Sequence, residues 1–331
     1  MVAFQAKDQI KNVGEVLLSV RNLRIYYGRE PALIRAVDGV SFDIKRGEIT
    51  ALVGESGSGK TTIALSILSL LPPAAKIVEG DILFKGRSIL HLKSREMQRI
   101  RGKEIGMVFQ EPHSYLNPLI KVGDQVAETL ILHENIGKEE ARSRVINIFE
   151  KVRIADPQRI YHYYPHQLSG GMAQRVGISI AIACNPSLLV ADEPTSNLDL
   201  TVQSQILHLL KNLSKELGLS VLLITHDLGV VSGLADRVVI VYAGKVAEEA
   251  DVYSIYTNPQ HPYTEVLLAS SRVAKIKSNI EASGFLPDLR NPPAGCRFST
   301  RCPYVLEKCS SEPPEVRGPN NSRVYCWLRG G

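Results

Sequence analysis

The stretch "ITALVGESGSGKTTIALSILSLL" (residues 49–71) predicts a buried strand, a glycine-rich turn and a helix in direct succession. Its centre, Gly54-x4-Gly59-Lys60-Thr61, matches the P-loop pattern between a strand and a helix, where that pattern acts. Glycines let backbone N–H groups curl around phosphate, and the helix N-terminus adds partial positive charge. We therefore predict a nucleoside triphosphate site rather than a flexible glycine turn. The residues expected to contact the nucleotide are Gly54, Glu55, Ser56, Gly57, Ser58, Gly59, Lys60, Thr61 and Thr62.

Four side chains in or beyond this loop have separate expected roles. Lys60 would reach the terminal phosphates, and the Thr61 hydroxyl would ligate Mg²⁺. In "LLVADEPTS" (188–196), four apolar residues carry Asp192 to the carboxyl end of a buried strand, where open α/β sheets bind ligands. Asp192 would hold Mg²⁺ and Glu193 would orient the attacking water. Taken alone, this pair indicates only a strand-end cap, and the P-loop is what favours catalysis.

Two further predicted strands end in polar side chains. Gln110 closes "EIGMVFQ" (104–110), and His226 follows "SVLLIT" in the run at 220–227. Gln110 would contact Mg²⁺ and water, and His226 would hydrogen-bond the γ-phosphate. Strands that alternate with helical patterns predict an α/β fold with a parallel sheet covered on both faces.

Composition is that of a globular chain of 331 residues, with 44% hydrophobic residues and a net charge of +5. No run approaches 18 apolar residues, and residues 1–16 lack a signal-peptide core, so we expect a soluble chain without a spanning segment. The basic excess is mild and lacks a dense Lys/Arg block, so no nucleic-acid partner is predicted.

A second glycine turn stands in "HQLSGGMAQRVGIS" (166–179), where Ser169 is expected to cap a helix that begins near Gly170. With the other motifs, this turn makes the chain resemble the nucleotide-binding subunit of an ABC transporter over residues 16–270. The motifs that carry the resemblance are Gly54–Thr61, Gln110, "LSGGM" (168–172), Asp192–Glu193, "SNLD" (196–199) and His226. Met172 replaces the commoner Gln of the signature, and we infer no lost activity from it.

The resemblance implies why one chain carries two glycine turns. In the family, two ATPases dock head to tail, and each signature closes over the nucleotide held by the other. Ser169, Gly170 and Gly171 would then face the partner's γ-phosphate. Asp199 would belong to the loop that links the two sites.

The resemblance also implies a P-loop NTPase fold with a RecA-like core, an antiparallel β subdomain and a helical signature subdomain. The ATPase domain would span residues 1–270, with the helical subdomain at about 111–183. Tyr27 would stack on adenine. Tyr26 is the alternative, because neighbouring strand residues point to opposite faces.

Two segments narrow the resemblance to the oligopeptide, dipeptide and nickel importer branch. They are "FQEPHSYLNPLIKVGDQV" (109–126) and "TNPQHPYTEVLLAS" (257–270). The tail, predicted as a module over 271–331, resembles the same branch. Its composition changes from about residue 284 to Pro- and Cys-rich sequence without periodicity, which predicts an appended module and not a continuation of the sheet.

Four cysteines of the tail lack the paired C-x2-C knuckles of a zinc ribbon, which counts against zinc. Four thiolates suffice for one [4Fe–4S] cluster, and the resemblance implies such a cluster. The alternatives are reduced cysteines that pack as small apolar groups, or disulfides formed in air. The ligands would be Cys296, Cys302, Cys309 and Cys326. Cys184, after the signature, is expected in the core.

The function implied is ATP hydrolysis in an importer for peptides, nickel or oligosaccharides, with ATP, Mg²⁺ and [4Fe–4S] as cofactors. The implied partners are two transmembrane permease subunits, a paralogous ATPase in a heterodimer and, indirectly, an extracytoplasmic solute-binding protein. The chain would lie at the cytoplasmic face of the membrane. The alternatives are a soluble repair or translation ABC protein, a P-loop kinase or GTPase-like switch, and an iron–sulfur sensor. The sequence leaves open the solute and whether the chain pairs with itself.

Overall fold

The computed structural model describes residues 14–271 and 284–330. Our predictions for the N-terminal residues 1–13 and for residues 272–283, at the start of the expected C-terminal module, fall outside this part. The chain divides into two compact units, which we describe one at a time. The first unit is Met1–Glu15, Lys45–Ile49 and Leu92–Leu223, and the second is Val16–Ile44, Thr50–His91 and Ile224–Gly331.

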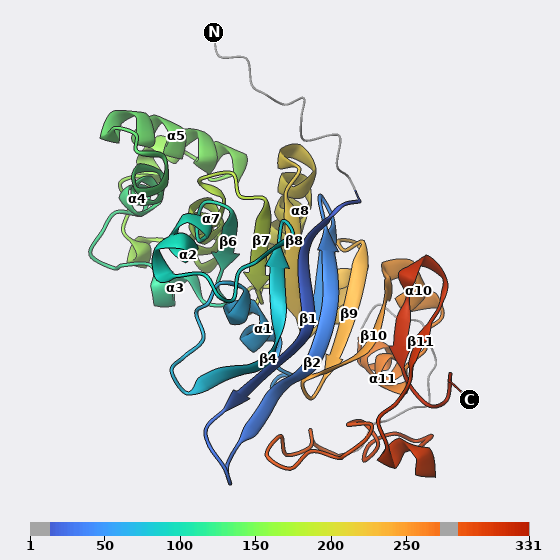
Figure 1. Cartoon of the computed structure of the whole chain (residues 1–331). Helices are drawn as coiled ribbons and strands as arrows, with labels where there is room; N and C mark the ends of the chain where they lie inside the picture. The colour runs from blue at the N-terminus through green and yellow to red at the C-terminus, as the bar shows by residue number, and fades with distance from the viewer. Residues whose placement is uncertain (1–13, 272–283, 331) are drawn as a thin grey trace. The chain divides into compact units, whose positions relative to one another are not determined.

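The second unit contains a four-stranded sheet in the order β2-β1-β4-β5, and Figure 1 shows β2, β1 and β4 side by side. β1 pairs antiparallel with β4, and β4 with β5. Inward side chains such as Leu23, Ile25 and Phe42 are buried, so one apolar face holds the sheet together. This confirms the antiparallel subdomain. The strands are β1 (Val16–Tyr27), β2 (Ile34–Lys45), β4 (Ala75–Phe84) and β5 (Arg87–Ser88).

A second run of neighbouring strands in this unit has the order β11-β12-β10-β9-β3. β3 and β9 are parallel and almost wholly buried, as expected for a strand covered on both faces. β10 is antiparallel to β9, so the predicted parallel sheet is mixed. The strands are β3 (Ile49–Val53), β9 (Arg237–Tyr242), β10 (Lys245–Asp251), β11 (Glu315–Arg317) and β12 (Arg323–Tyr325).

The prediction that the tail does not continue the sheet is wrong. β12 pairs antiparallel with β10, and β11 pairs with β12, so the C-terminal segment extends the run beyond β10. β11 and β12 have three residues each, which is too short to show the two-residue alternation on which strand prediction relies. The proposed boundary between residues 270 and 271 stays a prediction.

Short helices complete the second unit. The helix after the glycine loop ends at Ile67, earlier than the predicted helical pattern, which runs to Leu71. The Ser66 hydroxyl donates to the Ile63 carbonyl at 2.7 Å, and Ser69 has φ +50, so the chain leaves the helix before Leu71. The helices are α1 (Lys60–Ile67), α9 (Leu228–Val231), α10 (Val252–Thr257), α11 (Pro262–Ser270), η3 (Glu307–Ser310) and η4 (Pro319–Asn321).

The first unit joins parallel strands to a helical bundle. β6 (Ile105–Val108) is parallel to β7 (Leu188–Asp192), and β8 (Ser220–Thr225) follows β7 in the sheet. Gly106 is required in β6, because a Cβ there would lie 2.0 Å from the Ala181 carbonyl oxygen of the covering helix. The helices are α2 (Ser94–Ile100), α3 (Pro112–Tyr115), α4 (Val122–Glu134), α5 (Lys138–Lys151), α6 (Pro157–Ile160), η2 (Pro165–Gln167), α7 (Gly170–Ile182) and α8 (Leu200–Leu217).

Helices α4, α5 and α7 pack on one another through buried aliphatic and aromatic side chains, including Leu130, Phe149 and Val176. They form the group drawn in green in Figure 1. This confirms a helical subdomain, and its bounds at about 111–183 stay a prediction. Cys184 is buried after α7, and burial first of all raises the pKa of its thiol to about 11, as expected for a core cysteine. Within residues 14–271 and 284–330, no helix is both long and apolar enough to cross a membrane.

Candidate nucleotide-binding site

The glycine loop connects β3 to α1 and folds around the ammonium group of Lys60. The Lys60 side chain is buried, and its Nζ donates to the carbonyl oxygens of Gly54 at 2.8 Å and Glu55 at 2.9 Å. Gly59, the N-cap of α1, lies in the left-handed region and has no side chain with which to cap the helix. Backbone N–H groups at such a helix start are a ready anion site.

Three glycines of this loop are required for two different reasons. A Cβ on Gly54 would lie 2.1 Å from the Val241 carbonyl oxygen, and one on Gly59 would lie 2.3 Å from that of Ala36. Gly57 has more room but a φ of +82, which side chains disfavour. The P-loop pattern is therefore enforced by close backbone packing as well as by the expected phosphate.

The two tyrosines at the end of β1 point to different partners. The Tyr27 hydroxyl lies 3.1 Å from Thr62 Oγ1 of α1, whereas the Tyr26 hydroxyl donates to Asp38 at 2.9 Å. Tyr27 therefore lies beside the phosphate loop, and Tyr26 is engaged with β2. The role of Tyr27 as the adenine-stacking residue stays a prediction.

In the first unit, the structure brings Gln110 and Glu193 together. Gln110 Nε2 donates to Glu193 Oε2 at 3.4 Å. Asp192 is buried at the end of β7, and Glu193 follows with φ +44. The Ser196 hydroxyl donates to the Glu193 carbonyl at 3.0 Å, which helps to hold a backbone conformation that side-chain-bearing residues seldom adopt. The Glu193 carboxylate, carried on a strained backbone and oriented by the Gln110 amide, suits the predicted task of positioning water.

The second glycine turn starts α7 as predicted. Ser169 is its N-cap, and the hydroxyl accepts from the Met172 N–H at 3.3 Å. A Cβ on Gly171 would lie 2.7 Å from Val202 Cγ1, and one on Gly170 would lie 3.3 Å from Leu198 Cδ2. Ser169 and Gly170 are exposed. The turn thus presents a capped helix start to solvent.

Two predicted site residues, Asp199 and His226, lie at the ends of secondary-structure elements. Asp199 caps α8, because its Oδ1 accepts from the N–H groups of Thr201 and Val202 at 3.0 Å each. His226 is exposed directly after β8. The second unit contains the phosphate loop, Tyr27 and His226. The first unit contains the other residues predicted to bind nucleotide.

The sequence did not predict the residues of the C-terminal part of the chain that contact the phosphate loop and the strand β2. Arg301 Nη1 lies 2.9 Å from Glu55 Oε2, and the Glu55 N–H donates to the Tyr263 hydroxyl at 2.9 Å. Arg297 forms a buried ion pair with Asp38 at 2.5 Å. The one available signal was two arginines in the run "CRFSTRC" (296–302), and no spacing rule connects them to residues some 250 positions earlier.

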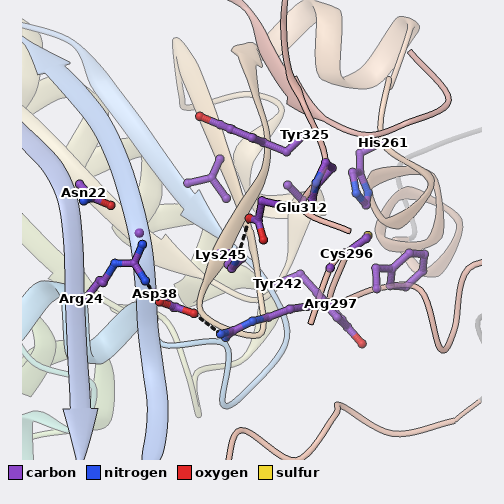
Figure 2. A pocket seen from close by; sticks show the side chains of 16 residues that line it. Asn22, Arg24, Asp38, Tyr242, Lys245, His261, Cys296, Arg297, Glu312 and Tyr325 are labelled. Atoms are coloured by element: carbon purple, nitrogen blue, oxygen red, sulfur yellow. Dashed lines mark hydrogen bonds and ion pairs between the residues drawn. The ribbon is translucent and has the colours of Figure 1, made fainter. Parts of the chain in front are cut away.

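A pocket of about 200 Å³ lies beside this support, and Cys296 is the one predicted site residue among those that line it. Figure 2 shows that its cations are paired, Arg297 with Asp38 and Lys245 with Glu312. No residue of the phosphate loop lines it. The pocket is therefore distinct from the predicted nucleotide site.

The four tail cysteines gather in one segment, and within the described part of the chain all are free of disulfides. The Cys296 N–H donates to the Cys309 carbonyl at 2.9 Å. Burial, followed by the neighbouring thiols of Cys309, Cys326 and Cys302, raises the pKa of Cys296 to about 11. Burial also raises the pKa of Cys302 and Cys326. Among the described residues, no group of three or more His, Cys, Asp or Glu is placed to hold a metal ion.

These features define a class. A strand–glycine loop–helix that encloses a lysine, a strand-end Asp–Glu pair and a serine-capped signature helix make this an ATP-binding cassette. The family model described as "ABC transporter" matches residues 37–196, and "Oligopeptide/dipeptide transporter, C-terminal region" matches residues 247–309. Two solved cassettes share the fold. The ADP- and phosphate-bound dimer of MJ0796 has a TM-score of 0.64 at 32% identity, over 71% of this chain and 98% of that one. CbiO1 from Clostridium perfringens has a TM-score of 0.64 at 29% identity, over 74% of this chain and 92% of that one.

Full-length relatives narrow the assignment. The oligopeptide transport ATP-binding protein AppD of Bacillus subtilis is 46% identical, over 94% of this chain and 96% of its own. The dipeptide transport ATP-binding proteins DppD of B. subtilis and Escherichia coli are 45% and 41% identical, over 95% and 91% of this chain and 95% and 92% of theirs. The chain belongs to the ABC transporter family of ATPases, in the branch with the oligopeptide/dipeptide C-terminal region. The transporter assignment is thereby favoured over the soluble repair or translation alternative.

Proposed function

We propose that this chain is the ATP-hydrolysing subunit of an ABC importer for peptides or a related solute. The observation that carries the proposal is likeness along the whole chain: relatives named as oligopeptide and dipeptide transport ATP-binding proteins align over more than 90% of it, the C-terminal region included. Nickel and oligosaccharides remain alternative solutes, because the permease and the solute-binding protein select the cargo.

Each predicted residue has a proposed role in ATP hydrolysis. Lys60 and the loop N–H groups bind the phosphates, and Tyr27 stacks on adenine. Glu193 orients the attacking water and accepts its proton, aided by its contact with Gln110. His226 donates a hydrogen bond to the γ-phosphate. Bound Mg²⁺ would neutralise phosphate charge, with Thr61, Gln110 and Asp192 as its proposed ligands.

Dimer closure is the proposed link to transport. The Ser169–Gly171 turn of one subunit, exposed at Ser169 and Gly170, would contact the γ-phosphate held by another, and Asp199 would lie between the two sites. The partner is proposed to be a paralogue, giving a heterodimer. ATP then joins the subunits, and hydrolysis removes the charge that holds them.

Membrane subunits are proposed to dock on the helical region at about 111–165, at the cytoplasmic face. The Leu119 and Leu132 side chains there are 84% and 75% exposed, which supports a contact surface for apolar permease segments. Two permeases and an extracytoplasmic solute-binding protein complete the proposed assembly. Gln110 lies at the start of this region, so it would couple the presence or absence of the γ-phosphate to the position of the docked permease segment.

The tail is proposed to hold a [4Fe–4S] cluster on Cys296, Cys302, Cys309 and Cys326. Burial, and after it the neighbouring thiols of Cys309, Cys326 and Cys302, raise the pKa of Cys296, so a cationic group beside these thiols would stabilise its thiolate. Each cysteine of such a cluster binds a different iron, so the thiols need not converge on a single ion. When bound, the cluster would fasten a segment with little core of its own.

Substitution of Glu193 by Gln tests the catalytic proposal. The amide keeps the shape and the contact with Gln110 but cannot accept a proton, so ATP hydrolysis should fall by at least about 100-fold while ATP binding persists. Lys60→Ala should lose binding itself, which separates the two roles. Steady-state hydrolysis near the wild-type rate in Glu193→Gln would refute the catalytic assignment.

Iron analysis tests the cluster independently of ATPase activity. Protein purified without oxygen should contain about four irons per chain and absorb broadly near ~400 nm. Cys309→Ser should lower both values, whereas Cys184→Ser, outside the tail, should leave them unchanged. Colourless, iron-free protein would remove the cluster from the proposal.

A further inference from the structure

The phosphate loop contains an acidic residue, Glu55, directly after Gly54. Its carboxylate accepts from Arg301 Nη1 through both oxygens, at 2.9 and 3.1 Å. The Arg301 side chain is 8% exposed and that of Glu55 is 29% exposed. This is a shielded ion pair between the loop and the C-terminal segment, and it is therefore stronger than an exposed surface pair.

Aromatic side chains fix the position of Arg301. Its guanidinium lies over the rings of Tyr242 and Phe298, 5.7 and 5.9 Å from their centroids, and Nη1 donates to the Tyr242 hydroxyl at 3.2 Å. Tyr242 and Phe298 pack in turn against Tyr263 at 4.6 and 5.4 Å from its ring. Contact with two rings and with the Tyr242 hydroxyl leaves the guanidinium few other positions.

The same layer holds the loop backbone. The Glu55 N–H donates to the hydroxyl of Tyr263, whose side chain is fully buried. Glu55 is thus held at its backbone by α11 and at its carboxylate by the C-terminal segment. Both contacts direct the carboxylate toward the buried layer.

Charge explains why this matters for the ligand. A nucleoside triphosphate carries several negative charges, and a carboxylate in the loop that binds it repels them. The cation of Arg301 compensates that carboxylate at contact distance. Without Arg301, the same loop would carry an uncompensated negative charge beside the phosphates.

We propose that Arg301 is a positioning residue for triphosphate binding: it neutralises and restrains Glu55, so the C-terminal segment sets the affinity of the phosphate loop. The proposal rests on the proposed role of loop 54–62 in holding ATP. Arg301 acts through Glu55 and does not itself contact the nucleotide.

A double-mutant cycle in the full chain tests this, with dissociation constants for ATP, ADP and adenosine measured by calorimetry. Arg301→Met keeps most of the buried volume and removes the charge, and it should weaken ATP binding about tenfold. The loss should be smaller for ADP and absent for adenosine, because it follows ligand charge. Glu55→Gln alone removes the negative charge and leaves the cation of Arg301 in place, so it should bind ATP more tightly than wild type.

The double variant decides between charge and structure. Glu55→Gln with Arg301→Met should recover ATP affinity to within about threefold of wild type, because no carboxylate is left to compensate. Arg317→Met, the same change at an exposed arginine of the C-terminal segment, should leave all three affinities unchanged. A double variant as weak as Arg301→Met, or an equal loss for adenosine, would show a structural role and overturn the proposal.

Lys60→Ala keeps this outcome separate from failure of the proposed function. It should lose ATP binding in every background. If Lys60→Ala bound ATP like wild type, the loop would not be the triphosphate site, and both the function and the role of Arg301 would fall. If Lys60→Ala lost binding while Arg301→Met did not, only the role of Arg301 would be refuted.

Discussion

The phosphate loop and the signature turn look alike in sequence, since each places serine and glycine before a helix, but they are built differently. The phosphate loop is packed against backbone, and its helix start has a glycine cap. The signature turn is exposed at Ser169 and Gly170 and is capped by Ser169, and a Cβ added to its glycines would meet the side chains of Leu198 and Val202. The first is a rigid cradle, and the second is a helix end presented to solvent.

This difference predicts unequal tolerance to mutation. Backbone atoms cannot move aside without disturbing a sheet, whereas a leucine or valine side chain can rotate.

Gly59→Ala should have the largest effect. The new Cβ would meet the Ala36 carbonyl at 2.3 Å, and φ is +97, so we expect a loss of more than ~3 kcal/mol. Gly57→Ala is the matched control, with a φ of +82 but its nearest neighbour at 3.9 Å; it should lose about 1–2 kcal/mol. Urea unfolding measures both. Equal losses would mean that backbone packing does not distinguish the two positions.

His261 should make the support of the phosphate loop sensitive to acid. Burial lowers its pKa to about 4, and its Nδ1 accepts from the Tyr263 N–H at 3.0 Å, which requires the neutral ring. Between pH 6.5 and 4 the unfolded chain binds the extra proton, so stability should fall as pH falls, by about 2 kcal/mol at pH 5.

His261→Asn isolates this contribution, because asparagine can cap α11 but does not titrate. The buried Glu248, whose pKa is raised by burial, is present in both proteins and cancels in the difference. The difference in unfolding free energy between wild type and His261→Asn should therefore change by about 2 kcal/mol from pH 8 to pH 5, because only the wild type loses the histidine contribution. A constant difference across this range would exclude the neutral buried histidine.

Ser169→Ala should lower stability by about 1 kcal/mol, because it removes the cap of α7. ATP binding to the isolated subunit should be unchanged, since the turn is expected to contact only a partner's nucleotide. Chemical denaturation and calorimetry give the two quantities. Weaker binding of ATP by the monomer would contradict the proposed division between cradle and closing turn.

Gly170→Ala should have the smallest effect on stability, within about 1 kcal/mol. Its Cβ would lie 3.3 Å from a leucine methyl group that can move by a few tenths of an ångström, and alanine favours the helix. Thermal unfolding is sufficient to measure it. A loss as large as that of Gly59→Ala would show that the two turns are equally rigid.

Much of the site was predictable because it depends on local rules. The strand-to-helix order around Gly54–Thr61, the cap at Ser169 and the strand that ends at Asp192 each follow from periodicity and turn chemistry within about ten residues. The proximity of Gln110 to Glu193 also followed, since both were expected at ends of strands in one sheet.

What the sequence determined alone is therefore the family, the two glycine turns and the core strands, because short-range spacing and apolar periodicity encode them. Only the tertiary structure decided that β12 extends the sheet beside β10, that Tyr27 and not Tyr26 lies by Thr62, and that Arg301 holds Glu55. Those contacts join residues up to 246 positions apart. Side-chain packing selects them at that range, and no local pattern records which distant partner a side chain will meet.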